Sequence, residues 1–278
     1  MKIHSSIRAR LALATALVAT ALLPRAGAAQ DSTARETAIQ DNSFLIEEAY
    51  NQERGVVQHI NTFAHPTTGR AWAYTLTEEW PAPGQRHQLS YTIPVVQSEG
   101  AKPARGIGDV AVNYRYQLRG MHAERVAIAP RLTVLLPTGD ADIGTGAGGT
   151  GLQANLPVSV ELSRTLVTHF NAGATVTPRA RLASQRARTT SWNAGGSAIW
   201  LLTHRVNAML EASWASVETL DGTSTSRESQ FLLAPGLRWS YDLANGTQIV
   251  PGIAVPLGIE PGDGSRSVFL YFSIEHPF

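Results

Sequence analysis

The sequence predicts an all-β protein, an antiparallel transmembrane outer-membrane β-barrel of about twelve strands, preceded by a short N-terminal periplasmic segment. Three observations predict this fold. The first residues have the layout of an export signal. From Gly55 onward, apolar and polar residues alternate with a period of two, as they do along β-strands. The connections between these segments broadly alternate between long and short, as do the extracellular loops and periplasmic turns of outer-membrane barrels.

The N-terminus predicts export from the cytoplasm. Lys2, Arg8 and Arg10 precede an apolar run over residues 11–23, and small residues follow at 26–28. The run is shorter than the ~20 apolar residues that a membrane-spanning helix needs, so we expect a cleaved signal peptide rather than an anchor. The expected division is 1–28 signal peptide, 29–54 N-terminal periplasmic or plug segment, and 55–278 transmembrane β-barrel. The location that follows is the outer membrane of a Gram-negative cell, reached through the periplasm.

Composition excludes several classes of function. The 278 residues include no cysteine, so neither disulfides nor thiolate metal sites are available. The net charge is +1 and only 16% of residues are charged, whereas nucleic-acid binding needs a basic stripe. We therefore expect no nucleic-acid partner.

Twelve segments are candidate strands, and the alternation is clearest in residues 109–118. There Val110, Val112 and Tyr114 share one face, while Asn113 and Arg115 share the other. In chain order, the predicted strands are 56–63, 70–80, 87–95, 109–118, 126–136, 151–162, 167–176, 192–201, 205–214, 230–241, 248–255 and 267–278. The long connections include residues 137–151, 178–190 and 216–228, and these are expected to be extracellular loops.

A secreted β-sandwich would show the same alternation, so other features decide between the two folds. No segment predicts helices that could cover the edges of a sandwich, whereas barrel closure removes those edges. Aromatic residues also stand near the ends of the apolar rows, where membrane interfaces favour them. They are Trp72, Trp80, Trp192, Trp200, Trp214, Trp239 and Tyr241. These observations favour the membrane barrel.

If the apolar faces contact lipid, the polar faces line the lumen. The lumen-lining candidates for solute binding are Asp109, Asn113, Arg115, Arg131, Asn155, Glu161, Glu211, Arg238 and Glu275. The same residues could instead be paired charges that only fill the barrel. The apolar residues 44–46 would be exposed in the periplasm, which suggests that the segment 29–54 enters the lumen as a plug.

The last strand, residues 267–278, is expected to close the barrel against the strand that begins near Val56. Val268, Leu270, Phe272, Ile274 and Phe278 share its lipid-facing row. A terminal aromatic residue in this position resembles the signal that the barrel assembly machinery reads in outer-membrane proteins. The expected partners are thus outer-membrane lipid, the assembly machinery through the strand ending at Phe278, and a small-molecule solute, with the barrel itself a monomer.

Two motifs carry a family resemblance. Residues 106–118 read GIGDVAVNYRYQL, and PRLTVLLPTGD at 130–140 leads into a glycine-rich loop and a further strand. This arrangement resembles the outer-membrane barrel family labelled as transporters of the MetA-pathway of phenol degradation. The resemblance implies a barrel that passes small apolar or aromatic compounds. Gly106, Gly108, Asp109 and residues 137–140 match its motifs; we expect the glycines to adopt positive φ at strand ends and the aspartates to cap loops.

No catalytic chemistry is predicted. The histidines lack metal-binding spacings, no nucleophile elbow is present, and no catalytic residue, metal site or cofactor is expected. Ser159 and His169 lie on neighbouring predicted strands, but such pairs are common in barrels rich in serine. The predicted function is a channel or transporter for small solutes; the alternative is a non-transporting structural or adhesion barrel whose long loops bind partners.

Overall fold

The computed structural model describes residues 39, 41–99, 103–121, 124–221, 224–259 and 264–278, so the expected signal peptide lies outside the described residues. All regular structure in the described residues is β-strand. The strands are β1 (Val56–Pro66), β2 (Trp72–Pro81), β3 (His87–Gln97), β4 (Arg105–Ile107), β5 (Val110–Tyr116), β6 (Val126–Ile128), β7 (Arg131–Leu136), β8 (Gly151–Asn155), β9 (Val158–Ser163), β10 (Leu166–Leu182), β11 (Gln185–Thr203), β12 (Val206–Asp221), β13 (Ser224–Trp239), β14 (Tyr241–Asp242), β15 (Gln248–Ala254), β16 (Leu257–Ile259) and β17 (Ser267–Pro277). Within these ranges, no helix is long and apolar enough to cross a membrane.

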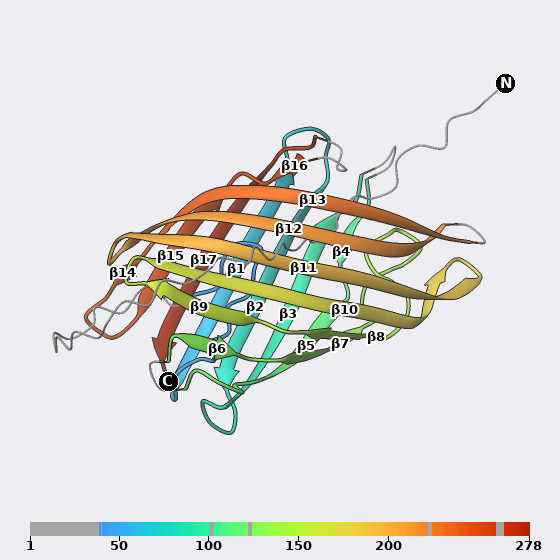
Figure 1. The fold of residues 1–278 in the computed structure, drawn as a ribbon. Helices are drawn as coiled ribbons and strands as arrows, with labels where there is room; N and C mark the ends of the chain where they lie inside the picture. The colour runs from blue at the N-terminus through green and yellow to red at the C-terminus, as the bar shows by residue number, and fades with distance from the viewer. Residues whose placement is uncertain (1–38, 40, 100–102, 122–123, 222–223, 260–263) are drawn as a thin grey trace.

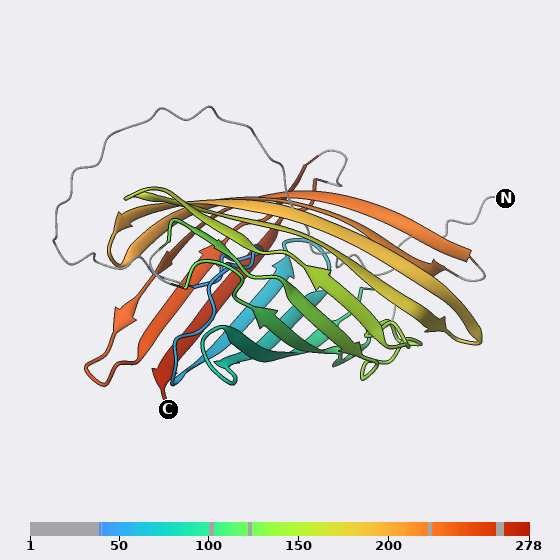
Figure 2. The same cartoon turned by 60° about the horizontal axis from the view of Figure 1, so that its bottom comes forward.

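The strands form one closed, antiparallel wall of 12 strands, as the sequence predicts. Several wall strands consist of two short pieces, for example β4 with β5 and β8 with β9. Closure is made by β1 and β17, whose register runs from Val56 opposite Pro277 to Pro66 opposite Ser267. Figures 1 and 2 show the strands tilted together around a common interior. Because every wall strand has two neighbours, the sheet has no free edge.

Prolines mark several of the breaks within wall strands. Pro130 separates β6 from β7, and Pro157 separates β8 from β9. Proline has no N–H to donate to the ladder. Neighbouring groups keep the wall connected there, because Ala129 N donates to the Pro157 carbonyl at 3.1 Å and Tyr116 N donates to the Pro130 carbonyl at 3.0 Å.

Alternation along β17 shows which face meets lipid. Val268, Leu270 and Phe272 are 37–44% exposed on the outer face, whereas Tyr271 and Ser273 on the other face are 3% and 0% exposed. Exposed apolar rows occur on the outer faces of other strands as well, including Val112 and Tyr114 on β5 and Leu132, Val134 and Leu136 on β7. An apolar outer surface on a closed sheet places the protein in a bilayer, and the fold is that of a barrel in the outer membrane.

The strands β10 to β13 extend much further than the sequence indicated. The segments 178–190 and 216–228 were expected to be loops, but β10 continues to Leu182, β11 begins at Gln185, β12 continues to Asp221 and β13 begins at Ser224. Figure 2 shows these four strands, coloured yellow to orange, as long hairpins. Their outer parts alternate without an apolar row, since they lie beyond the lipid, and an apolar row was the signal used to predict strands.

The expected conformation of the motif glycines is wrong. Gly106, Gly108 and Gly139 are not among the glycines with positive φ. Gly139 is instead required by close packing, since a Cβ there would lie 2.6 Å from the Thr145 carbonyl oxygen. The capping role of Asp109 is confirmed, because its carboxylate accepts hydrogen bonds from Gly139 N at 3.0 Å and Ala147 N at 2.7 Å.

Candidate functional site

The lumen contains part of the chain itself, which we call the inner segment (residues 41–54). It precedes β1 in the chain and lies on the inner side of the barrel wall. The segment turns back on itself, because Glu48 N donates to the Asn42 side chain at 3.0 Å. Its two arms meet at Gln58 of β1: Gln58 donates to Asp41 at 2.8 Å and accepts from the Gln52 side chain. Both arms of the described segment therefore lie beside Gln58, near the start of β1.

Side chains of the barrel wall accept hydrogen bonds from the backbone amides of this loop. The Glu211 carboxylate on β12 accepts from Phe44 N at 2.7 Å and Leu45 N at 2.6 Å. Asn171 on β10 accepts from Glu47 N at 2.8 Å. The same role is taken further along the loop by Ser159, Gln117 and Gln88, which accept from Ala49, Asn51 and Gln52. Backbone donors that would be unsatisfied inside a barrel are thus paired.

Two buried arginines bind the backbone carbonyls of the loop. Arg238 on β13 donates to the carbonyls of Ile39, Asp41 and Asn42 at 3.0, 2.6 and 2.8 Å. Arg115 on β5 donates to the carbonyl of Glu48 at 3.1 Å and to that of Tyr50. Both guanidinium groups are almost completely buried. A buried cation is costly without such partners, so the loop and the arginines stabilise each other.

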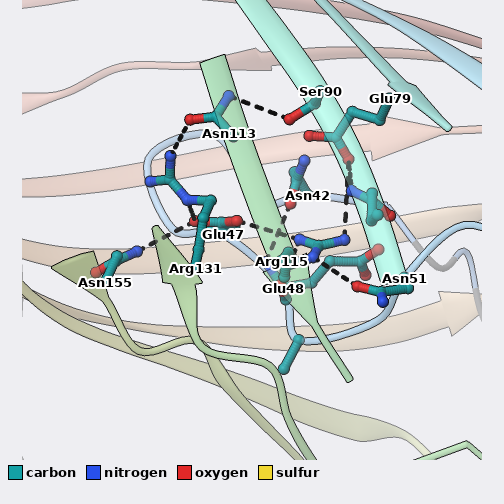
Figure 3. A network of polar contacts seen from close by, with 12 residues as sticks. Asn42, Glu47, Glu48, Asn51, Glu79, Ser90, Asn113, Arg115, Arg131 and Asn155 are labelled. Atoms are coloured by element: carbon teal, nitrogen blue, oxygen red, sulfur yellow. Dashed lines mark hydrogen bonds and ion pairs between the residues drawn. The ribbon is translucent and has the colours of Figure 1, made fainter. Parts of the chain in front are cut away.

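Glu47 is the charged centre of the loop. Its carboxylate lies between two arginines, 3.2 Å from Arg115 Nη1 and 2.9 Å from Arg131 Nε, and accepts from Asn155 at 3.1 Å (Figure 3). Burial acts to raise the pKa of Glu47, but the positive charges of Arg131 and Arg115 outweigh it and lower the pKa below its ordinary value. Glu47 is therefore ionised at neutral pH, and its negative charge is shared by the two arginines beside it.

An apolar recess in the wall receives Phe44. Its ring packs edge-on against Phe269 and Tyr271, with centroids 6.0 and 6.1 Å away. Gly236 and Gly252 make the recess possible, because a Cβ at either position would lie 2.4 or 2.6 Å from the Phe44 ring. The lumen is therefore polar around Glu47 and apolar around Phe44.

Ser159 and His169 form a hydrogen bond of 2.7 Å between Oγ and Nδ1. Both side chains are buried, and Ser159 also accepts from Ala49 N. The Tyr50 ring packs edge-on to His169 at 6.4 Å. The inner segment thus covers the pair, which binds the backbone of the loop.

The structure brings most of the predicted lumen residues to one place. Asn113, Arg115, Arg131, Asn155, Glu211 and Arg238 all belong to the network around the inner segment. Asp109 is apart from it at the opposite end of the wall, where its carboxylate binds the backbone of loop 137–150. Glu161 and Glu275 are half-buried, opposite Val167 on β10 and Gln58 on β1 respectively.

Sequence reasoning missed two groups of functional residues. The uncharged acceptors Gln88, Gln117 and Asn171 were not singled out, and Ser159 was considered only as a partner of His169, although each stands on the polar face of its strand. The apolar recess was also missed, since polar residues alone were expected in the lumen. Its signal was present in strands that are apolar on both faces, as in β17, where Phe269 and Tyr271 alternate with Leu270 and Phe272.

No group of three or more metal-ligating side chains occurs in the described part of the chain. The aspartates of loop 137–150 have structural partners: the Asp140 carboxylate accepts from Asp142 N at 2.8 Å, and the Asp142 carboxylate accepts from Ala183 N at 2.9 Å. These contacts fix the loop against the β10–β11 hairpin.

Comparison with known proteins identifies the fold. No protein-family model matches the chain, and no curated protein matches it in sequence. Among solved structures, an outer membrane channel from Pseudomonas putida F1 is similar with a TM-score of 0.62 at 13% identity, covering 83% of this chain and 98% of that one. The NanC porin is similar with a TM-score of 0.51 at 8% identity, covering 79% of this chain and 100% of that one. At such low identity, the likeness is one of fold.

Proposed function

We propose that the protein is a channel for small solutes in the outer membrane, and that the inner segment closes its periplasmic half until it moves. The observation that carries the proposal is the way the segment is held. Wall side chains bind its backbone by hydrogen bonds, and Glu47 adds an ion pair with Arg115 and Arg131. Contacts of this kind can break and re-form without unfolding the wall. The fold shared with a solved outer membrane channel supports the same reading.

The recess that holds Phe44 suggests the class of solute. It is lined by Phe269 and Tyr271 and is deepened by Gly252. When Phe44 leaves, the recess offers an aromatic-sized apolar surface beside the charged residues of the lumen. This combination suits small solutes with an aromatic ring and a polar group, in agreement with the resemblance to the phenol-degradation transporter family.

The second candidate is a structural or adhesion barrel that transports nothing. The observation that favours it is the long projection of the β10–β11 and β12–β13 hairpins, which could bind partners outside the cell. Permeability of the reconstituted protein distinguishes the two candidates.

A disulfide across the lumen tests the proposal directly. Ser43 Oγ on the inner segment lies 3.1 Å from Ser197 Oγ on β11, and the native chain has no cysteine to interfere. We expect Ser43→Cys combined with Ser197→Cys to form a bond that fixes the segment in place. In liposome swelling assays with phenyl glycosides and sugars of matched size, oxidation should abolish permeation, and reduction should restore it.

The single variants Ser43→Cys and Ser197→Cys are the matched controls and should respond to neither oxidant nor reductant. Equal permeation by the oxidised and reduced double variant would refute gating by the segment. Absence of permeation for every solute, even after reduction, would instead refute the channel and favour the adhesion barrel.

We also infer that the outer row of β17 is what the barrel assembly machinery recognises. Val268, Leu270, Phe272 and Phe278 are exposed on that row, and β17 forms the closing seam with β1. A strand that pairs last must be presented to its partner while the wall is still open.

A further inference from the structure

The outer part of the β10–β11 hairpin carries an unusual concentration of arginine. Arg179 and Arg181 stand on β10, and Arg186 and Arg188 stand on β11, all of them exposed. The hairpin belongs to the extracellular end of the barrel, opposite the seam between Gly55 and Phe278. We call these four residues the arginine face.

The register places the arginine face on the outside of the wall. On β11, Thr189 is buried toward the lumen and Trp192 is exposed toward lipid, so Arg186 and Arg188 share the outward face with Trp192. Arg181 lies directly opposite Arg186. A register shift between Thr177 and Ala180 keeps Ala180 buried, and it turns Arg179 outward beside Arg181.

A hollow lies at the foot of this face. It has a volume of about 570 Å³ and is lined by Pro137, Gly148, Gly149, Thr150, Pro178, Arg179 and Arg186. Pro137 directly follows Leu136, and Thr150 is two residues from Leu152; both leucines are exposed on the lipid-facing surface. The hollow therefore begins where the apolar surface ends, at the depth where headgroups lie.

The charge at the hollow is not balanced by nearby acids. Arg181 is 3.8 Å from Asp142, and Arg227 on β13 is 3.3 Å from Glu218. Among the described residues, no carboxylate lies within ion-pair distance of the two arginines that line the hollow, Arg179 and Arg186. Two unpaired guanidinium groups next to a cavity form a site for an anion with several oxygen acceptors.

We propose that this hollow binds a phosphate group on the headgroup of a membrane lipid in the outer leaflet. Arg179 and Arg186 donate to the phosphate oxygens, Thr150 offers a hydroxyl, and the acyl chains lie along Leu136, Leu152 and Trp192. Lipid is the occupant that the position favours, because the site is continuous with the lipid-facing surface and opens away from the lumen. The site is independent of solute passage.

The test is binding of lipid A to the full-length protein in detergent, measured by native mass spectrometry. Lipid A with both phosphates is compared with the same lipid after enzymatic removal of the phosphates. We expect the phosphorylated lipid to bind to the native protein. The double variant Arg179→Gln with Arg186→Gln should bind this lipid with an affinity lower by a factor of about ten or more. The control is Arg119→Gln with Arg205→Gln, which removes the same charge from exposed positions at the periplasmic end.

Retention of the folded form on an unheated gel shows that either double variant still forms the barrel. The proposal is overturned if the two double variants bind lipid equally, or if the dephosphorylated lipid binds as well as the phosphorylated one. It is also overturned if inorganic phosphate displaces the lipid at equal concentration, since the site would then recognise a free anion.

Discussion

At the scale of single residues, several of the most deeply buried polar side chains of the wall bind backbone groups of the inner segment. Arg115, Arg238 and Glu211 are among the most buried side chains of the protein, and all three bind main-chain groups of the inner segment. From the sequence, these residues could be assigned to the lumen because they alternate with lipid-facing neighbours. Their binding partner could not be assigned, because the contacted groups are backbone atoms, which nearly all residue types share.

Gly252 offers a test of the recess at this scale. Substitution Gly252→Ala places a methyl group 2.6 Å from the Phe44 ring, so the ring must leave the recess. We expect a higher single-channel conductance in planar bilayers, because the inner segment is held less firmly.

Two further variants make that result specific. Gly84→Ala is the control, because a Cβ there would meet nothing within 4 Å. Adding Phe44→Ala to Gly252→Ala should remove the clash but also the ring that fills the recess, so conductance should stay high. A conductance of Gly252→Ala equal to that of the native protein would contradict the role of Phe44.

At the scale of elements, the two long hairpins depend on different contacts along their length. The ladder between β11 and β12 runs from Thr203 opposite Val206 to Trp192 opposite Ser216. Beyond Ser216, β12 pairs with β13 alone, up to Asp221 opposite Ser224. The inner part of each hairpin therefore belongs to the barrel wall, and the outer part is a two-stranded ribbon.

Shortening the β12–β13 hairpin should consequently spare the barrel. We expect a variant in which residues 219–226 are replaced by Asn-Gly to keep the heat-dependent shift in gel mobility that a folded barrel shows, since only pairing within the ribbon is lost. Deletion of eight residues from the wall portion of the same two strands should abolish that shift. Loss of the folded form in the shortened ribbon would show that the ribbon is needed for assembly.

The outer parts of the hairpins are the strand segments that could not be predicted from the sequence. Alternation identified all twelve wall strands because lipid requires an apolar row on each outer face. In the outer parts of these hairpins the outward face carries Arg in place of apolar residues, as at Arg179, Arg181, Arg186 and Arg188, so the apolar row is absent and residues 178–190 were expected to form a loop. Strand pairing there is stabilised by cross-strand neighbours, which depend on register and are not visible one residue at a time.

At the scale of the whole molecule, the inner segment and the wall form one electrostatic system centred on Glu47. The flanking arginines lower the pKa of Glu47 from its ordinary value of 4.5. A carboxyl group whose pKa is lowered in the folded state stabilises that state above its ordinary pKa, and the contribution is lost as pH falls through the lowered value. The closed state should therefore be stable at neutral pH and weaken in acid.

We expect the conductance of the native protein to be low at pH 7 and to rise reversibly below about pH 4.5. In Glu47→Gln, Arg131 loses its carboxylate partner at every pH and Arg115 keeps only Glu79, 3.9 Å away, so conductance should already be high at pH 7 and should change little on acidification. Planar bilayer recordings across this pH range measure both. An acid response of the same size in Glu47→Gln and native protein would show that another group controls closure.

The hydrogen bond from Phe278 N to the Gly55 carbonyl, at 2.9 Å, joins the two ends of the barrel wall just where the inner segment ends and β1 begins. This junction also determines the order in which the wall and the inner segment assemble. The wall side chains that hold the segment come from strands on all sides, including β3, β5, β10, β12 and β13, so its binding site is incomplete until the seam between β1 and β17 has formed. The segment must therefore settle last, after the membrane part has assembled, and a newly inserted barrel passes through an open stage before it first closes.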